Sequence, residues 1–142
     1  MAGVANYDEP QWQPISKLAM LTAHGEQGVQ LAEEHLATLG QARERLYVLD
    51  NATVAGVLRT FGKTRADLVE LYLEQGRRWQ VLDLGATQRR DVERYVALVA
   101  RELALVEQIL ALAEELRSGT IERTLAKSDL ELGMEVLGIK LA

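Results

Sequence analysis

The chain has 142 residues, of which 48% are hydrophobic, and this length suits one domain that buries a sizeable core without covalent staples. The absence of cysteine excludes disulfides, thiolate nucleophiles and cysteine-ligated zinc or iron-sulfur centres. The net charge of -5 disfavours generic attraction to nucleic acid or anionic lipid, because such binding neutralises phosphate groups with surplus Lys and Arg.

Residues 1–13 form a polar arm, and we expect residues 14–142 to form a single domain. Pro14 suits the first position of a helix, where a missing N–H group leaves no hydrogen bond unmade. From there, apolar side chains recur at intervals of three and four residues, the spacing of one helix face. Gly40 follows as a C-terminal cap. The pattern predicts a first helix over residues 14–39.

Two glycines, Gly25 and Gly28, lie within the apolar face of this helix. Each costs roughly 0.8 to 1 kcal/mol relative to alanine in a helix interior. A kink or a break would account for them. We favour a close crossing with another helix, because a residue without a side chain lets two backbones approach.

A second helix is predicted over residues 52–82, with Asp50 or Asn51 as its N-cap. Its apolar face becomes polar after Tyr72. The loop before it contains three apolar residues, 47–49, which we expect to plug the end of the core.

A third helix is predicted over residues 88–117, with Thr87 as its N-cap and Gly119 just beyond its end. Two short helices, over 120–127 and 129–138, follow as a tail that must dock on something to be ordered. Long helices joined by short loops pack against their neighbours in sequence. We therefore predict an all-α fold, an antiparallel bundle of three long helices with a short helical C-terminal tail.

The third helix is apolar over roughly 160° of its circumference between Asp91 and Leu116. Two neighbours in a monomeric bundle cover only about 100° to 140° of a helix. The C-terminal tail would cover the remaining margin, or a second copy would cover it by packing about a two-fold axis. We predict a homodimer whose self-association face contains Leu98, Leu105 and Leu112.

Helical bundles often hold metals, but the di-iron pattern requires a Glu-x-x-His motif on each of two helices. The two histidines, His24 and His35, are 11 residues apart, about 16 Å along one helix. Neither has a carboxylate three or four residues away. We expect no metal or other cofactor within one chain, and an ion shared between two subunits is the alternative.

The serines also offer no nucleophilic site. Ser16, Ser118 and Ser128 lie near predicted helix ends, where capping explains them. No glycine-rich phosphate-binding motif occurs in the chain. Because no catalytic motif is present, we expect that the protein is not an enzyme.

Arginines and aromatic residues gather at the turn between the second and third predicted helices. Arg89 and Arg90 sit at a helix N-terminus, where the helix dipole disfavours cations, and a bound anion would offset this unfavourable interaction. The aromatic rings would stack on a base or a proline. The alternative is that Trp12 and Trp79 cap the core, while the arginines are solvated or paired with Asp83, Asp91 and Glu93. The candidate anion or partner site comprises Arg77, Arg78, Arg89, Arg90, Trp12, Trp79 and Tyr95.

These features favour protein-protein interaction, by an adaptor or regulatory module that self-associates and recognises another protein. A phospholigand or nucleic-acid binding module that uses the arginine and aromatic residues is the alternative, although the charge makes nucleic acid an unexpected partner. A metal-dependent enzyme with a site between subunits comes third. We expect a cytoplasmic protein with no membrane contact, because neither a signal peptide nor a membrane-spanning apolar run is visible. The excess of arginine over lysine indicates a GC-rich bacterial genome.

Overall fold

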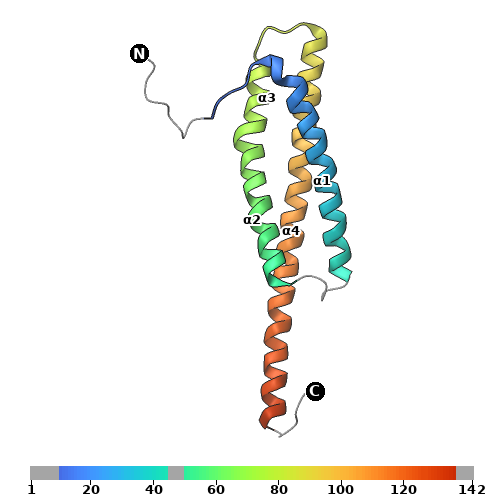
Figure 1. The fold of residues 1–142 in the computed structure, drawn as a ribbon, viewed down its shortest axis with the longest axis vertical. Coiled ribbons are helices and arrows are strands. Elements are labelled where there is room, and N and C mark those ends of the chain that lie inside the picture. Colours follow the sequence, from blue (N-terminus) through green and yellow to red (C-terminus); the bar gives the residue numbers. More distant parts are fainter. Residues whose placement is uncertain (1–9, 45–49, 137–142) are drawn as a thin grey trace, which may run out of the picture.

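The computed structural model describes residues 10–44 and 50–136, with side chains described as far as Gly119. Its elements are η1 (Ile15–Lys17), α1 (Leu18–Glu44), α2 (Asn51–Asp67), η2 (Leu68–Tyr72), α3 (Leu73–Gln80) and α4 (Ala86–Val136). α2, η2 and α3 follow one another without a break and make one long helix. Figure 1 shows that α1 and α4 run in the same direction while this middle helix runs the opposite way. The predicted all-α, up-down-up bundle is therefore confirmed.

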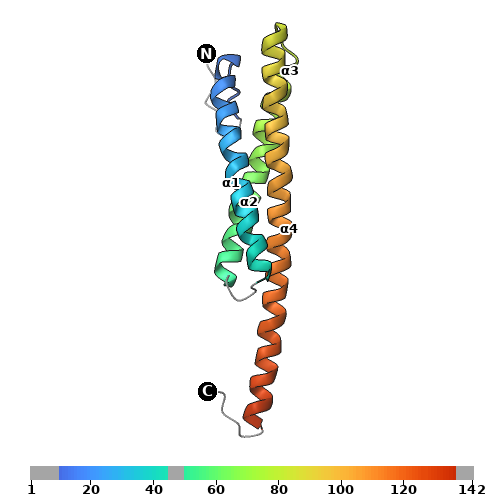
Figure 2. The same ribbon diagram turned by 90° about the vertical axis from the view of Figure 1, so that its right-hand side faces the viewer.

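α4 is the central helix of the bundle. Both α1 and the middle helix pack along it, as the two views in Figures 1 and 2 show. Buried residues form two clusters along this helix, one toward the end of α1 and one toward α3. Because most of the largest fully buried side chains come from α4, its register sets the shape of the core. Those side chains are Trp79, Tyr95, Ile109, Val54, Val92, Val99 and Val106.

α1 packs closely on α4 because small residues line its inner face. Its buried positions include Gly25 and Ala32, one heptad apart. A Cβ atom added at Gly25 would lie 3.7 Å from the Cβ atom of Leu98, and one added at Gly28 would overlap the carboxylate of Glu102. Gly25 therefore lies against α4, as the prediction requires, whereas Gly28 makes room for the Glu102 side chain.

Ion pairs follow the same register on the outside of the α1–α4 interface. Glu26 pairs with Arg94, and Glu33 pairs with Arg101 at 3.1 Å, so both partners advance by seven residues. A constant offset between paired residues is what two parallel helices require. Exposed pairs of this kind add little free energy each, about 0 to 1 kcal/mol, and mainly support the register that the core sets.

Several predicted helix ends are wrong. α1 continues past Gly40 to Glu44, and α4 continues past Gly119, so the two short tail helices are one extension of α4. A single glycine costs only about 1 kcal/mol, less than the cost of nucleating a new helix beyond it. Thr87 lies inside α4, because the N–H group of Arg89 already donates to the Gly85 carbonyl at 2.9 Å.

The predicted cap of the second helix is confirmed. The Asp50 side chain accepts a hydrogen bond from the Thr53 N–H group at 2.7 Å, and this bond lowers the pKa of Asp50. The predicted core plug at residues 47–49 lies outside the described residues.

The middle helix contains a π turn that the sequence pattern did not predict. The N–H group of Leu73 donates to the carbonyl of Leu68, five residues earlier. The extra residue in this turn changes the face that the following helix presents to α4. As a result Gly76 meets α4, where an added Cβ would lie 2.6 Å from Cγ2 of Val96 and 3.2 Å from the ring of Tyr95.

Gln75, a polar residue on the inner face of the middle helix, binds the N-terminal arm. Gln75 is 5% exposed, and its side-chain amide accepts from the Gln13 N–H group and donates to the Gln13 carbonyl. The indole N–H group of Trp79 donates to the same carbonyl at 3.1 Å. Buried polar groups require such partners, so the arm explains why the predicted apolar face becomes polar after Tyr72.

We expect Gly76→Ala to destabilise the fold by about 1 to 2 kcal/mol, because crowding against the branched side chain of Val96 outweighs the gain in helix propensity. Gly62→Ala is the matched control, since a Cβ there meets nothing within 4 Å and should stabilise the protein by about 0.8 to 1 kcal/mol. Urea unfolding followed by circular dichroism measures both effects. Equal stabilisation by the two variants would contradict the close α3–α4 contact.

Candidate functional site

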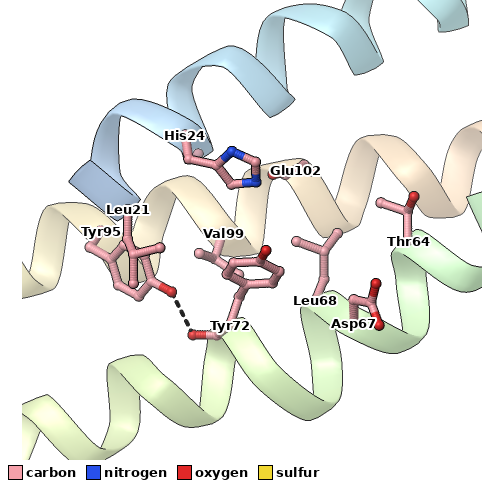
Figure 3. A pocket seen from close by; sticks show the side chains of 10 residues that line it. Leu21, His24, Thr64, Asp67, Leu68, Tyr72, Tyr95, Val99 and Glu102 are labelled. Carbon is pink, nitrogen blue, oxygen red and sulfur yellow. Dashed lines mark hydrogen bonds between the residues drawn. The ribbon is translucent and has the colours of Figure 1, made fainter. Parts of the chain in front are cut away.

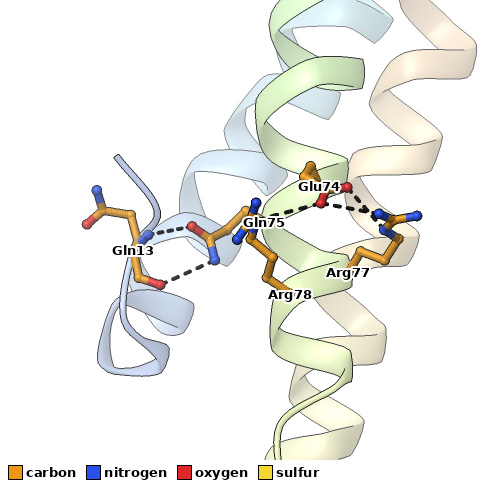
Figure 4. A network of polar contacts seen from close by, with 5 residues as sticks. All are labelled: Gln13, Glu74, Gln75, Arg77 and Arg78. Carbon is orange, nitrogen blue, oxygen red and sulfur yellow. Dashed lines mark hydrogen bonds and ion pairs between the residues drawn. The ribbon is translucent and has the colours of Figure 1, made fainter. Parts of the chain in front are cut away.

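The structure assembles only part of the predicted arginine and aromatic site. The guanidinium carbon of Arg78 lies 4.3 Å from the centroid of the Trp12 ring, a cation-π contact. Arg77 and Arg78 both pair with Glu74, at 3.0 and 3.6 Å (Figure 4). Arg89 donates to the Leu82 carbonyl at 3.4 Å. Much of the positive charge at this end is therefore already compensated within the chain.

The two inner rings of this predicted site are not available to a ligand. Trp79 and Tyr95 are 2% and 1% exposed, and they pack edge to face with centroids 5.2 Å apart. Their prediction as stacking residues is wrong, because both belong to the core beside α3. Glu74 was missed by the sequence analysis, although it precedes Arg77 and Arg78 by three and four residues, the spacing of helical ion pairs. Arg90 is exposed on α4.

Of the three leucines predicted to be covered by the tail or by a second subunit, Leu105 is buried within one chain, and Leu98 and Leu112 are partly buried. Leu105 is 5% exposed and belongs to the core cluster near the end of α1, and Leu112 packs against the same cluster. Leu98 is half-buried beneath Gly25. The prediction that Leu105 is left partly exposed is wrong, because small residues let α1 come close enough to cover the wide face of α4.

A pocket of about 160 Å³ lies where α1, η2 and α4 meet, and Figure 3 shows its lining. Its polar side chains come from all three helices, and aliphatic residues fill the space between them. The polar lining residues are His24 on α1, Thr64, Asp67 and Tyr72 on the middle helix, and Tyr95 and Glu102 on α4.

Glu102 is the residue that makes this pocket unusual. The core residues of α4 alternate steps of three and four along the helix, and Glu102 occupies the position between Val99 and Val106 where an apolar residue belongs. Glu102 was not among the predicted site residues, although it interrupts the apolar spacing of the helix. A carboxylate placed in a core seam costs free energy unless something compensates it.

The surroundings of Glu102 shift its titration. The side chain is half-buried, and this burial raises the pKa of the carboxyl group, with the nearby His24 acting in the opposite direction. Within the described part of the chain, no hydrogen bond or ion pair reaches the carboxylate. The space it occupies exists because residue 28 is glycine.

Aromatic contacts frame the same region. His24 stacks on Tyr72 with ring centroids 5.8 Å apart, and His35 meets Phe61 edge to face at 5.1 Å. The hydroxyl group of Tyr95 donates to the Tyr72 carbonyl at 2.9 Å, which ties α4 to the π turn. Burial raises the pKa of Tyr95, so this phenol stays protonated and keeps donating.

The described residues contain neither a group suited to a metal ion nor a helix suited to span a membrane. No group of three or more His, Asp or Glu side chains there is arranged to hold a metal ion. Likewise, none of the described helices combines the length and the apolar character needed to cross a membrane.

Comparison with protein-family models, with curated proteins and with solved structures finds no match to the chain.

Replacing Glu102 tests its electrostatic cost. A raised folded-state pKa means that the folded protein loses stability as pH rises from the ordinary value of 4.5 through the raised value. We expect Glu102→Gln to be more stable than the native protein at neutral pH, and the difference to disappear below pH 4.5. Urea unfolding across this pH range measures it.

Glu93→Gln, at an exposed position on the same helix, is the matched control and should show no such pH-dependent gain. A Glu102→Gln variant that is less stable than the native protein at neutral pH would show that the carboxylate contributes to the fold.

Proposed function

We propose that the chain is a protein-protein interaction module that self-associates through the C-terminal part of α4. The observation that carries this proposal is the length of α4. Leu116 belongs to the core cluster beside the end of α1, but α4 continues to Val136. In both views the helix extends past the ends of α1 and α2 (Figures 1 and 2). Residues 120–136 span about 25 Å at 1.5 Å per residue.

A helix of this length needs a partner. Most helical stability in proteins comes from packing an apolar face, and this part of α4 extends beyond both helices that pack on the rest of it (Figures 1 and 2). Gly119 and Gly133 weaken this segment further. Apolar residues nevertheless recur along its sequence at intervals of four and seven residues, which supports packing against another helix. These residues are Ile121, Leu125, Leu132 and Val136.

The charges of the segment favour a second copy as the partner. Within residues 120–128 two basic residues and one acidic residue give a net charge of +1, whereas residues 129–136 contain three acidic residues and no basic one. Two copies that pair antiparallel about a two-fold axis place the basic half of each against the acidic half of the other. A parallel pair would place like charges together. The proposed dimer is therefore antiparallel.

Charge exchange tests this arrangement. We expect the native protein to have twice its monomer mass of 15.8 kDa by light scattering on a sizing column. Arg123→Glu with Lys127→Glu, or Asp129→Lys with Glu131→Lys, should each weaken the dimer about tenfold or more, because like charges then face each other. All four substitutions in one chain restore opposite charges and should restore the dimer. A native protein that stays monomeric, or dimers unaffected by either pair, would refute the proposal.

Disulfide cross-linking tests the direction of pairing. Because the chain has no native cysteine, an introduced cysteine can pair only with its copy in the other subunit. Ser128→Cys lies between the basic and acidic halves, so the two copies of residue 128 should meet and form a disulfide under oxidation. Thr120→Cys is the control, because its two copies would lie roughly 24 Å apart in the antiparallel pair. Efficient cross-linking at both positions would indicate a parallel dimer instead.

A further inference from the structure

We propose that the pocket between α1, η2 and α4 binds a small organic cation, an amine or a quaternary ammonium group. This inference does not rest on the proposed self-association, since the pocket lies within the three-helix body (Figure 3). Four properties of the pocket carry it: its charge, its rings, its size and the glycine that shapes it.

The charge of the lining selects a cation. Two carboxylates, from Asp67 and Glu102, line the pocket, and its lining includes no Lys or Arg. Asp67 already pairs with Lys63 at 2.9 Å on the outside of the helix. Glu102 has no such ion pair among the described residues, and the basic side chain of the lining is His24, whose charge favours the ionised carboxylate. A bound cation supplies a direct partner, by a charge-assisted hydrogen bond from an amine or by its charge alone from a quaternary ammonium group.

The rings and the size of the pocket select an organic cation over a hydrated inorganic one. Tyr72, a lining tyrosine whose ring is not fully buried, contributes an aromatic ring, and such rings attract alkylammonium groups through their faces. Leu21 and Leu68 supply apolar surface for methyl groups. The volume of about 160 Å³ matches a cavity known to hold benzene, about 150 Å³, so the ligand is one of roughly five to seven heavy atoms.

Two local features place residues that line this pocket. The carboxylate of Glu102 occupies the space that a side chain at position 28 would fill, so Gly28 sets where the charge lies. The π turn of η2 contributes Leu68 and Tyr72 to the lining, and π turns in proteins occur frequently at functional sites. Both features weaken the helices that contain them, and both shape the same pocket.

Nuclear magnetic resonance titration of the full-length protein tests the proposal. The probes are methylammonium, butylammonium and tetramethylammonium chloride, with tert-butanol as the neutral probe of similar shape and sodium acetate as the anion. We expect saturable amide shifts in η2 and around His24 with at least one organic cation. Neither tert-butanol nor acetate should reproduce them.

Variants then assign the binding to the pocket. Glu102→Gln should weaken cation binding about tenfold or more, whereas Glu93→Gln, an exposed position on the same helix, should leave it unchanged. Gly28→Ala moves the carboxylate without removing it and should also weaken binding, which provides a second test if Glu102→Gln folds poorly. The absence of saturable shifts with every cation, equal binding of tert-butanol, or undiminished binding by Glu102→Gln would each overturn the proposal.

Discussion

The close parallel packing of α1 on α4 is the contact on which the rest of the structure depends. Gly25 and Ala32 remove side-chain bulk from the inner face of α1, and the backbone comes near enough to cover Leu98 and Leu105. Helices that pack this closely bury more of each other's surface, which stabilises the fold despite the low helix propensity of glycine. With α1 on one side and the middle helix on the other, most of the wide apolar face of α4 is covered by helices of the same chain.

The same packing explains how a carboxylate stands in the core seam. A larger residue at position 28 would push the Glu102 side chain away, and a looser crossing would let water reach it fully. The bundle instead holds Glu102 half-buried beside His24 and the π turn. Three departures from a regular helical pattern lie together here: a carboxylate in the core seam, a glycine inside α1 and the π turn. In natural proteins such departures concentrate at functional sites.

The helical periodicity of the sequence was sufficient to predict the fold class, the direction of the helices and the close crossing at Gly25. It did not predict the helix ends near Gly40 and Gly119, because one glycine weakens a helix by less than its neighbours stabilise it. The π turn was also missed, since a single inserted residue leaves the composition of the helix unchanged.

The candidate sites were harder to predict than the fold. The sequence indicated a wide apolar face on α4. How much of that face one chain covers depends on the distance between α1 and α4, and this distance cannot be obtained from the sequence. Trp79 was expected either in the arginine site or as a cap of the core, and its burial agrees with the second expectation. Glu102 was detectable as a break in the seam, yet only the structure shows that Gly28 and His24 face it.

The register of α4 changes where its neighbours end. Up to Leu116 its buried residues advance by alternate steps of three and four, and continuing those steps reaches Thr120, Arg123 and Lys127, all polar. The face that α1 and α2 cover therefore stops being apolar at the level where those helices stop. Apolar residues continue at Ile121 and Leu125, on a different line along the helix. A helix that only continued the bundle core would keep its register, so the change supports a different neighbour for the C-terminal part of α4.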